Sequence, residues 1–180
     1  MVEAALIHPL AERRFACPGI SLAPAPFAER ISLRADFEAA SAIGNKLGFK
    51  LPSRPRSSAG NEAVTALWLG PDEWMLVAQS GTATGKKLDG LDGALFSAVD
   101  VSHRNTAIMV EGTKAADAIN SGCPQDLSLD GFPVGACART ILAKSEIILW
   151  RESEHKFRVE CWGSFADYVW NYLVDAAKSA

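Results

Sequence analysis

Apolar residues gather in short runs separated by polar turns, and this pattern predicts the secondary structure. Within residues 67–78, two apolar runs lie on either side of a Gly-Pro-Asp-Glu turn at 70–73. The proline presets the backbone angle that a β-turn needs, and glycine and aspartate are common at its other positions. We therefore predict a β-hairpin with Trp68 and Trp74 on its arms.

A second hairpin follows the same plan later in the chain. Residues 147–150 and 157–162 are apolar runs, and the polar residues 151–156 lie between them. The repetition predicts that the chain is internally doubled.

Cap residues set the bounds of the predicted helices. Asp36 predicts the N-cap of a helix that runs through about Leu47, and Gly48 predicts its end. Ser164 predicts the N-cap of the last helix, whose apolar residues form a stripe at helical spacing as far as Ala176.

Two strand–helix segments can be aligned with each other. Residues 33–43 and 109–119 each contain Ala-Ala, a polar residue and Ala-Ile in the same register. Thr113 is the predicted N-cap of the second helix, over 114–120. Strand, helix, hairpin and helix follow in the same order in both halves, which predicts two βαββαβ, or ferredoxin-like, units in one α+β body. The other predicted elements are strands at 31–34, 94–102, 106–111 and 139–143, and a short helix at 83–91.

The N-terminal region differs from the rest. Residues 1–30 contain four prolines and no lasting periodicity, so we predict an extended arm. Residues 31–180 are predicted to form a single body of two pseudo-repeats, 31–102 and 103–180.

Composition and charge exclude some classes of function and indicate where the protein is located. A net charge of −3 and a pI near 5.6 argue against a nucleic-acid-binding protein. No apolar run approaches the ~20 residues that span a bilayer. The N-terminus is a poor secretory signal, and the four cysteines are widely spaced. We therefore predict a cytoplasmic protein with reduced thiols.

The segment 100–104 suggests a hydrolase at first, because it holds Asp100, Ser102 and His103. Neighbouring side chains of a strand face opposite sides, so Ser102 and His103 cannot easily bond to each other there. The G-x-S-x-G elbow is missing as well. A structural interpretation is favoured, in which Asp100 or Ser102 caps a turn and His103 and Arg104 pair locally.

Other motifs give weaker evidence for a functional site. Residues 81–87 look like a phosphate loop, but three residues rather than four separate the glycines, and Lys87 replaces the Ser/Thr that binds the metal ion. A hairpin-to-helix loop is the better interpretation. The three histidines have no ligand-like spacing, so no metal site is predicted. Five tryptophans are many for this length and favour a subunit with a protein interface.

Four blocks of the sequence carry a family resemblance, which runs from about Ile31 to the C-terminus. The blocks are LGPDEWMLVA, VDVSHRNTAIMVEG, GCPQDLSLDGFPVGACART and RVECWGSFADYVWNYL. Through them the chain resembles the gamma-subunit family of heterotetrameric sarcosine oxidase. The resemblance implies a fold similar to the folate-binding domain of aminomethyltransferases, with two ferredoxin-like halves.

The same resemblance implies a role inside a complex. Holoenzymes of this family oxidatively demethylate sarcosine to glycine, with hydrogen peroxide and formaldehyde, or methylenetetrahydrofolate when tetrahydrofolate is present. FAD, FMN and NAD belong to the two large subunits and zinc to the other small one. The chain is therefore expected to bind alpha, beta and delta subunits as a noncatalytic scaffold without a cofactor of its own. Catalysis within the chain itself stays an open question.

An alternative is a stand-alone folate-binding one-carbon protein. The aminomethyltransferase relatives carry Asp-Val-Ser-His before their second half, which residues 100–103 match. They also carry Gly-Gly-x-x-Asp-Asp at a hairpin strand. The corresponding residues 143–147 lack the glycine pair, and Glu146 replaces at best one aspartate. The folate-pocket candidates are Asp100, Arg139 and Glu146, and no catalytic residue is assigned.

Overall fold

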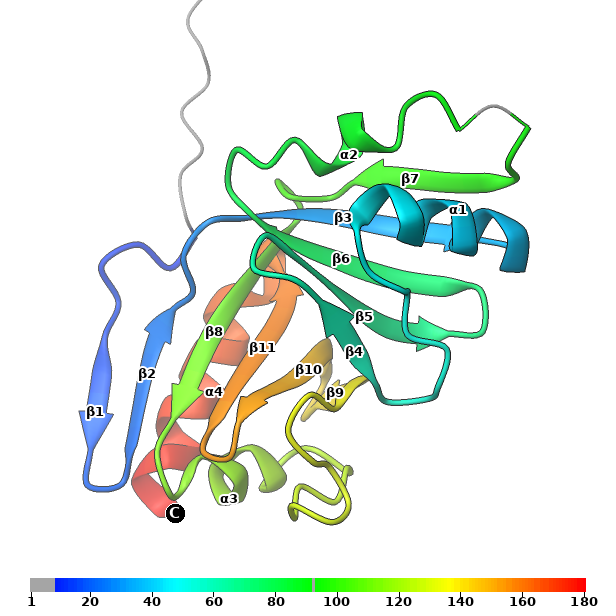
Figure 1. Ribbon diagram of the computed structural model, residues 1–180. Helices are drawn as coiled ribbons and strands as arrows, with labels where there is room; N and C mark the ends of the chain where they lie inside the picture. Colours follow the sequence, from blue (N-terminus) through cyan, green and yellow to red (C-terminus); the bar gives the residue numbers. More distant parts are fainter. Residues whose placement is uncertain (1–8, 92) are drawn as a thin grey trace, which may run out of the picture.

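Two antiparallel sheets form the body of the protein, and helices cover the outer face of each (Figure 1). The computed structural model describes residues 9–91 and 93–180. Helices α1 and α2 pack on the smaller sheet, and α3 and α4 pack on the larger one. The inner faces of the two sheets meet in a separate apolar cluster that includes Leu67, Met75, Cys137 and Ile148. The layers are therefore helices, sheet, sheet and helices.

The smaller sheet has the strand order β4-β5-β6-β3-β7. Its elements are β3 (Ala28–Ala35), α1 (Phe37–Leu47), β4 (Ser58–Gly60), β5 (Val64–Gly70), β6 (Glu73–Gln79), α2 (Thr84–Lys87) and β7 (Phe96–Asp100).

The larger sheet has the order β1-β2-β8-β11-β10-β9. Its elements are β1 (Phe15–Cys17), β2 (Ile20–Pro24), β8 (Asn105–Glu111), α3 (Ala115–Asn120), β9 (Cys137–Leu142), β10 (Ser145–Ser153), β11 (Lys156–Trp162), the 3-10 turn η1 (Gly163–Phe165) and α4 (Ala166–Ser179).

The two sheets repeat one topology. Strands β4, β5, β6, β3 and β7 of one sheet correspond in order to β9, β10, β11, β8 and β2 of the other. Each half is thus a ferredoxin-like unit, with one added edge strand (β4) in the smaller sheet and two (β9 and β1) in the larger one. The predicted α+β class with two fused halves is confirmed. The fourth strand of the second unit, β2, comes from the N-terminal region rather than from the C-terminus.

The prediction of an extended arm over residues 1–30 is therefore corrected. In the described part of that segment, residues 15–17 and 20–24 are strands of the larger sheet, and Ala28 begins β3. The physical reason is burial: Ile20 and Leu22 of β2 lie in the core beneath the helices. Leu22 also pairs with Val110 of β8. Removing these side chains from water stabilises the hairpin despite its prolines.

Helix α1 follows the predicted caps. The Asp36 side chain accepts a hydrogen bond from Ala39 N at 2.8 Å, and Gly48 ends the helix with φ of 81°. The predicted caps of the other two helices are wrong. The residue at the N-cap of α3 is Lys114, and that of α4 is Phe165, because η1 precedes α4.

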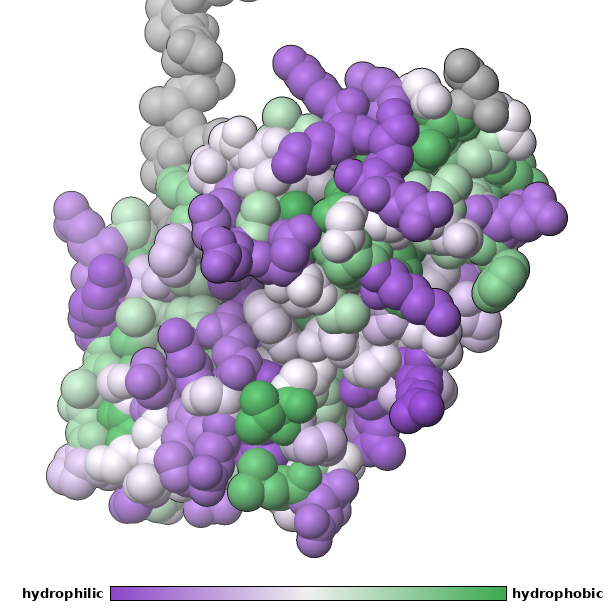
Figure 2. Space-filling view, viewed as in Figure 1, coloured by the Kyte–Doolittle hydropathy of each residue, from purple (hydrophilic) through white to green (hydrophobic). Residues whose placement is uncertain are grey.

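Some apolar side chains remain on the surface. Figure 2 shows hydrophobic surface over the layer formed by α1 and β7. There Phe37 is 87% exposed and Leu95 is 77% exposed. Within the described residues, no helix combines the length and the apolar character that crossing a bilayer requires.

Candidate functional site

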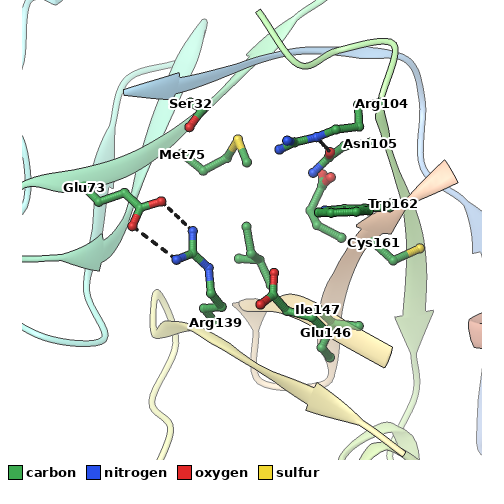
Figure 3. Close-up of a pocket in the computed structure, with 12 residues that line it drawn as sticks. Ser32, Glu73, Met75, Arg104, Asn105, Arg139, Glu146, Ile147, Cys161 and Trp162 are labelled. Atoms are coloured by element: carbon green, nitrogen blue, oxygen red, sulfur yellow. Dashed lines mark hydrogen bonds and ion pairs between the residues drawn. The ribbon is translucent and has the colours of Figure 1, made fainter. Parts of the chain in front are cut away.

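A polar pocket of about 230 Å³ lies between the two sheets (Figure 3). Strands from both halves line it, so its residues come from distant parts of the sequence. Its charged and amide side chains are Glu73, Arg104, Asn105, Arg139, Glu146 and Glu160.

One wall is an ion pair between the sheets. Glu73 at the start of β6 accepts hydrogen bonds from Arg139 of β9, at 2.5 Å to Nη2 and 3.1 Å to Nη1. Arg34 also donates to Glu73, at 3.2 Å. The bonds from Arg139 hold the pKa of Glu73 below its usual value and outweigh the partial burial that raises it. The carboxylate is thereby kept charged and fully engaged.

The opposite wall combines an aromatic ring with a cation. The Arg104 guanidinium lies 5.2 Å from the centroid of the Trp162 ring, and its Nε donates to Asn105 Oδ1 at 3.1 Å. Stacking and hydrogen bonding together fix the direction of this arginine, while its side chain remains exposed. This wall thus presents an oriented positive charge.

Glu146 enters the pocket from β10. Its side chain is exposed and makes no hydrogen bond or ion pair with any residue in the described ranges 9–91 and 93–180. The pKa of Arg139 is raised, mainly by its hydrogen bond to Glu73 and to a lesser extent by the charge of Glu146. Glu146 is therefore a carboxylate available to a ligand or partner.

The deepest charge is Glu160 of β11. It receives Arg30 Nε on Oε2 at 2.6 Å and Arg158 Nε on Oε1 at 2.7 Å. All three side chains are buried. The carboxylate is thus neutralised by two arginines and does not face a ligand as a free acid.

The structure brings together two of the three predicted folate-pocket residues. Arg139 and Glu146 line the pocket, but Asp100 does not. Asp100 lies at the end of β7, where its carboxylate accepts from Ser102 N at 2.8 Å. The hydrogen bonds from Ser102 lower the pKa of Asp100. Asp100 therefore stabilises a turn, which is the structural alternative derived from the sequence.

The Ser102–His103 segment has no hydrolase geometry. Ser102 Oγ accepts from Arg30 N at 2.9 Å, and among the described residues no hydrogen bond joins it to His103. Arg104 pairs locally, as predicted, through its hydrogen bond to Asn105, and it also stacks on Trp162.

The loop that looks like a phosphate loop already holds an anion. The amides of Ala83 and Thr84 each donate to a carboxylate oxygen of Glu29, at 2.8 Å. Burial raises the pKa of Glu29, but the bonds from Thr84 and Ala83 outweigh it, and the pKa is lowered. Helix α2 thus begins on an internal carboxylate, which leaves this position unsuited to a phosphate.

Sequence reasoning missed Glu73, Arg104 and Trp162 as pocket residues. Glu73 belongs to the Gly-Pro-Asp-Glu turn, and the sequence pattern indicates no role for it beyond that turn. Trp162 was one of several tryptophans, yet it is 44% exposed whereas Trp74 and Trp170 are buried. No spacing in the sequence indicates that β6, β11 and the residue before β8 bring these side chains together.

Comparison with known proteins decides the family. The model of the sarcosine oxidase gamma subunit family matches residues 32–179. The chain belongs to this family. The sarcosine oxidase subunit gamma of Corynebacterium sp. (strain U-96) is 33% identical over 164 residues, which cover 87% of this chain and 78% of the relative. The corresponding subunit of Arthrobacter sp. is 30% identical, over 83% of this chain and 76% of the relative.

Solved structures show the same similarity. A chain of the heterotetrameric sarcosine oxidase from Corynebacterium sp. U-96, in complex with pyrrole 2-carboxylate, matches with a TM-score of 0.84 and 30% identity. The match covers 89% of this gamma-family chain and 84% of the other chain. The glycine cleavage aminomethyltransferase T from Bartonella henselae matches at a TM-score of 0.63 and 14% identity, over 87% of this chain and 45% of that one. This second likeness shows a shared fold.

Proposed function

We propose that the chain is the gamma subunit of a heterotetrameric sarcosine oxidase and acts as a scaffold without a reaction site. The complex oxidatively demethylates sarcosine to glycine in the cytoplasm, giving hydrogen peroxide and formaldehyde or methylenetetrahydrofolate. The partners are the alpha, beta and delta subunits. The observation that carries the proposal is the TM-score of 0.84 to a chain of such a heterotetramer, over 84% of that chain.

The pairing of charged side chains with one another in the pocket supports a role as a scaffold. Glu73 is held by Arg139 and Arg34, and Glu160 is held by Arg30 and Arg158. These groups join the sheets to each other and have little capacity left for a substrate. Their arrangement favours rigidity over chemistry.

The cofactors of the complex are FAD, FMN, NAD, zinc and tetrahydrofolate, and we assign them to the other subunits. Burial raises the pKa of the Cys137 and Cys161 thiols to about 12, which disfavours the thiolates that zinc binds. Within the described residues, no three His, Cys, Asp or Glu side chains are grouped as metal ligands. The pocket of about 230 Å³ is below the roughly 300–1,000 Å³ of typical ligand sites. The inter-sheet pocket therefore fits neither a zinc ion nor a flavin.

Co-purification tests the subunit assignment. A tagged chain is co-expressed with the genes that neighbour its own, and the eluate is examined for flavin absorbance and for sarcosine-dependent peroxide formation. We expect larger flavin-containing subunits to elute with the tag in a fixed ratio. Elution of the chain alone from a lysate that contains the flavin subunits contradicts the assignment.

Variants of the assembled complex test the absence of a reaction site. Glu146→Gln and Asp100→Asn remove charges at two candidate positions with little change in shape. We expect kcat for sarcosine oxidation to stay within about twofold of the wild type, less than 0.5 kcal/mol in the barrier. A loss of about 100-fold in either variant shows that the chain contributes a catalytic group.

A stand-alone folate-binding protein remains the second candidate, because Arg139 and Glu146 line one pocket. Titration calorimetry of the isolated chain with tetrahydrofolate separates the two functions. The scaffold predicts no heat of binding. Clear binding that is lost in Glu146→Ala supports the second candidate.

A further inference from the structure

Trp162 lines the inter-sheet pocket, and further exposed apolar side chains lie in the segments that follow β11 and end β9. Trp162, Phe165 and Tyr168 are 41–45% exposed, and Ile141 is 49% exposed. The ring centroids of Trp162 and Phe165 are 6.3 Å apart. Tyr168 Oη accepts from Lys144 N, at 3.4 Å, which places α4 beside the β9–β10 turn. We name Trp162, Phe165, Tyr168, Ile141, Arg104 and Lys144 the Trp162 surface.

Two cations of the Trp162 surface lack an acidic partner. Arg104 and Lys144 are exposed, and neither forms an ion pair with a carboxylate of the described residues. The nearby acid Asp167 is paired with Arg13 at 2.6 Å. These two exposed cations share the side of the chain that carries the Trp162 surface with one unpaired carboxylate, Glu146, so cations outnumber free acids there by two to one. Such a site complements a negatively charged partner.

The guanidinium of Arg104 is held in an orientation that can bind a carboxylate. Asn105 and the Trp162 ring fix its guanidinium, so less side-chain entropy is lost when a partner binds. Glu146 lies on the other side of the pocket from Arg104 (Figure 3), so an incoming acid at Arg104 avoids it. Aromatic residues and arginine are also the types that dominate the energy of protein interfaces.

The size of the pocket favours a polypeptide over a cofactor. Its volume of about 230 Å³ is smaller than that of typical small-molecule sites, roughly 300–1,000 Å³. A pocket of this size has room for one large side chain of a partner, which would lie against Trp162 in its wall. Exclusion of water around such a side chain is typical of the centre of a stable interface.

We propose that the Trp162 surface is the docking site for an acidic and apolar segment of another subunit. An apolar side chain of that segment packs on Trp162 and Phe165, one of its carboxylates binds Arg104, and another binds Lys144. The inference rests on the proposed function, since it names the surface through which the scaffold holds its partner.

Co-expressed variants test the docking site. Trp162→Ala and Arg104→Ala are expected to weaken association with the other subunits by about 30-fold or more, the size of a hot-spot loss. Arg104→Lys keeps the charge but loses the planar fork and is expected to be intermediate. Phe37→Ala removes a more exposed apolar side chain elsewhere and is the matched control, with no loss expected. Circular dichroism of each free variant checks that it is folded.

The outcomes separate the two proposals. If the wild-type chain does not co-purify with flavin subunits, the proposed function fails. If the wild type co-purifies and the Trp162 and Arg104 variants do so equally well, the docking site is wrong. A loss in Phe37→Ala alone assigns docking to the surface over α1 and β7 and also overturns the proposal.

Zero-length cross-linking tests the chemistry of the partner. A carbodiimide joins the Lys144 amine to a carboxylate only when the two are in direct contact. We expect peptide mapping of the complex to show Lys144 linked to an aspartate or glutamate of another subunit. Lys144→Arg keeps the charge but cannot form this link and is the control. Intersubunit links confined to Lys46 and Lys50 of α1 and its following loop contradict the proposal.

Discussion

Arg30 Nε of β3 donates a hydrogen bond to Glu160 Oε2 of β11 at 2.6 Å, and this bond joins the two sheets. Arg158 Nε binds the other oxygen of Glu160 at 2.7 Å. The three side chains are at most 8% exposed, so water screens the charges poorly. The carboxylate is the shared partner that allows two guanidinium groups to remain buried.

Removing this carboxylate is expected to destabilise the protein strongly. Glu160→Ala leaves two buried arginines without a counter-charge, and we expect a loss of about 3–5 kcal/mol in the free energy of unfolding. Urea denaturation of the purified chain measures it. Glu154→Ala, which removes an exposed acid, is the control, and its cost should stay within ~0.5 kcal/mol. A Glu160→Ala cost near that of the control contradicts the role of the buried cluster.

The ion pair of Glu73 with Arg139 predicts a pH dependence. Because the pKa of Glu73 is lower in the folded chain than its usual value of 4.5, its contribution to stability is complete above that value. The contribution is lost as the pH falls through the folded pKa. Glu73→Gln should therefore cost about 1 kcal/mol at neutral pH and progressively less in acid.

Thermal unfolding of the two proteins over a series of pH values measures this difference. The exposed Glu62 has no ion-pair partner among the described residues, so Glu62→Gln is the matched control, with no pH-dependent difference expected. A Glu73→Gln difference that stays constant from neutral pH to well below 4.5 shows that the ion pair is not the cause.

Thiol reactivity provides a third prediction. Burial raises the pKa of Cys137 and Cys161 to about 12, so neither forms a significant amount of thiolate at neutral pH. Cys17 is partly exposed. We expect an alkylating reagent to modify Cys17 first, and Cys137 and Cys161 only after denaturation. Mass spectrometry of time points identifies the sites, and rapid labelling of Cys137 or Cys161 in the folded chain contradicts their burial.

Local signals in the sequence predicted α1 and both hairpins well. Asp36 and Gly48 act within a few residues of themselves, and the structure uses them as the sequence indicates. The turn at 70–73 likewise joins β5 and β6. The predicted cap Ser164 is wrong, because residues 163–165 first form a 3-10 turn. Interactions between residues close in sequence thus determine the positions of these elements, but they do not always identify the residue at which a helix begins.

These local signals do not predict which strands pair when the strands are far apart in the sequence. β2 completes the larger sheet beside β8, a strand more than eighty residues away along the chain, by pairs such as Ser21 with Glu111. The pocket has the same origin, since Arg139 and Glu73 come from different sheets. Arg139 and Glu146 were candidates through a family resemblance, whereas nothing local marked Glu73 or Arg104.

Gly112 offers a test of the link between the N-terminal hairpin and the second half. Its φ is +133°, and a Cβ there would collide with the carbonyl oxygen of Gly19 in the β1–β2 turn. That carbonyl also accepts from Lys114 N at 3.0 Å. Gly112→Ala should therefore combine backbone strain with displacement of the hairpin, a cost of about 2–4 kcal/mol.

Gly81→Ala is the matched control, because Gly81 also has a positive φ but nothing lies within 4 Å of its added Cβ. That variant should lose only the backbone cost of about 1–2 kcal/mol. Hydrogen exchange then locates the difference: residues 20–24 should lose protection in Gly112→Ala and keep it in Gly81→Ala. Equal protection in both variants would show that β2 is held by its buried side chains alone, independently of the contact between Gly19 and Gly112.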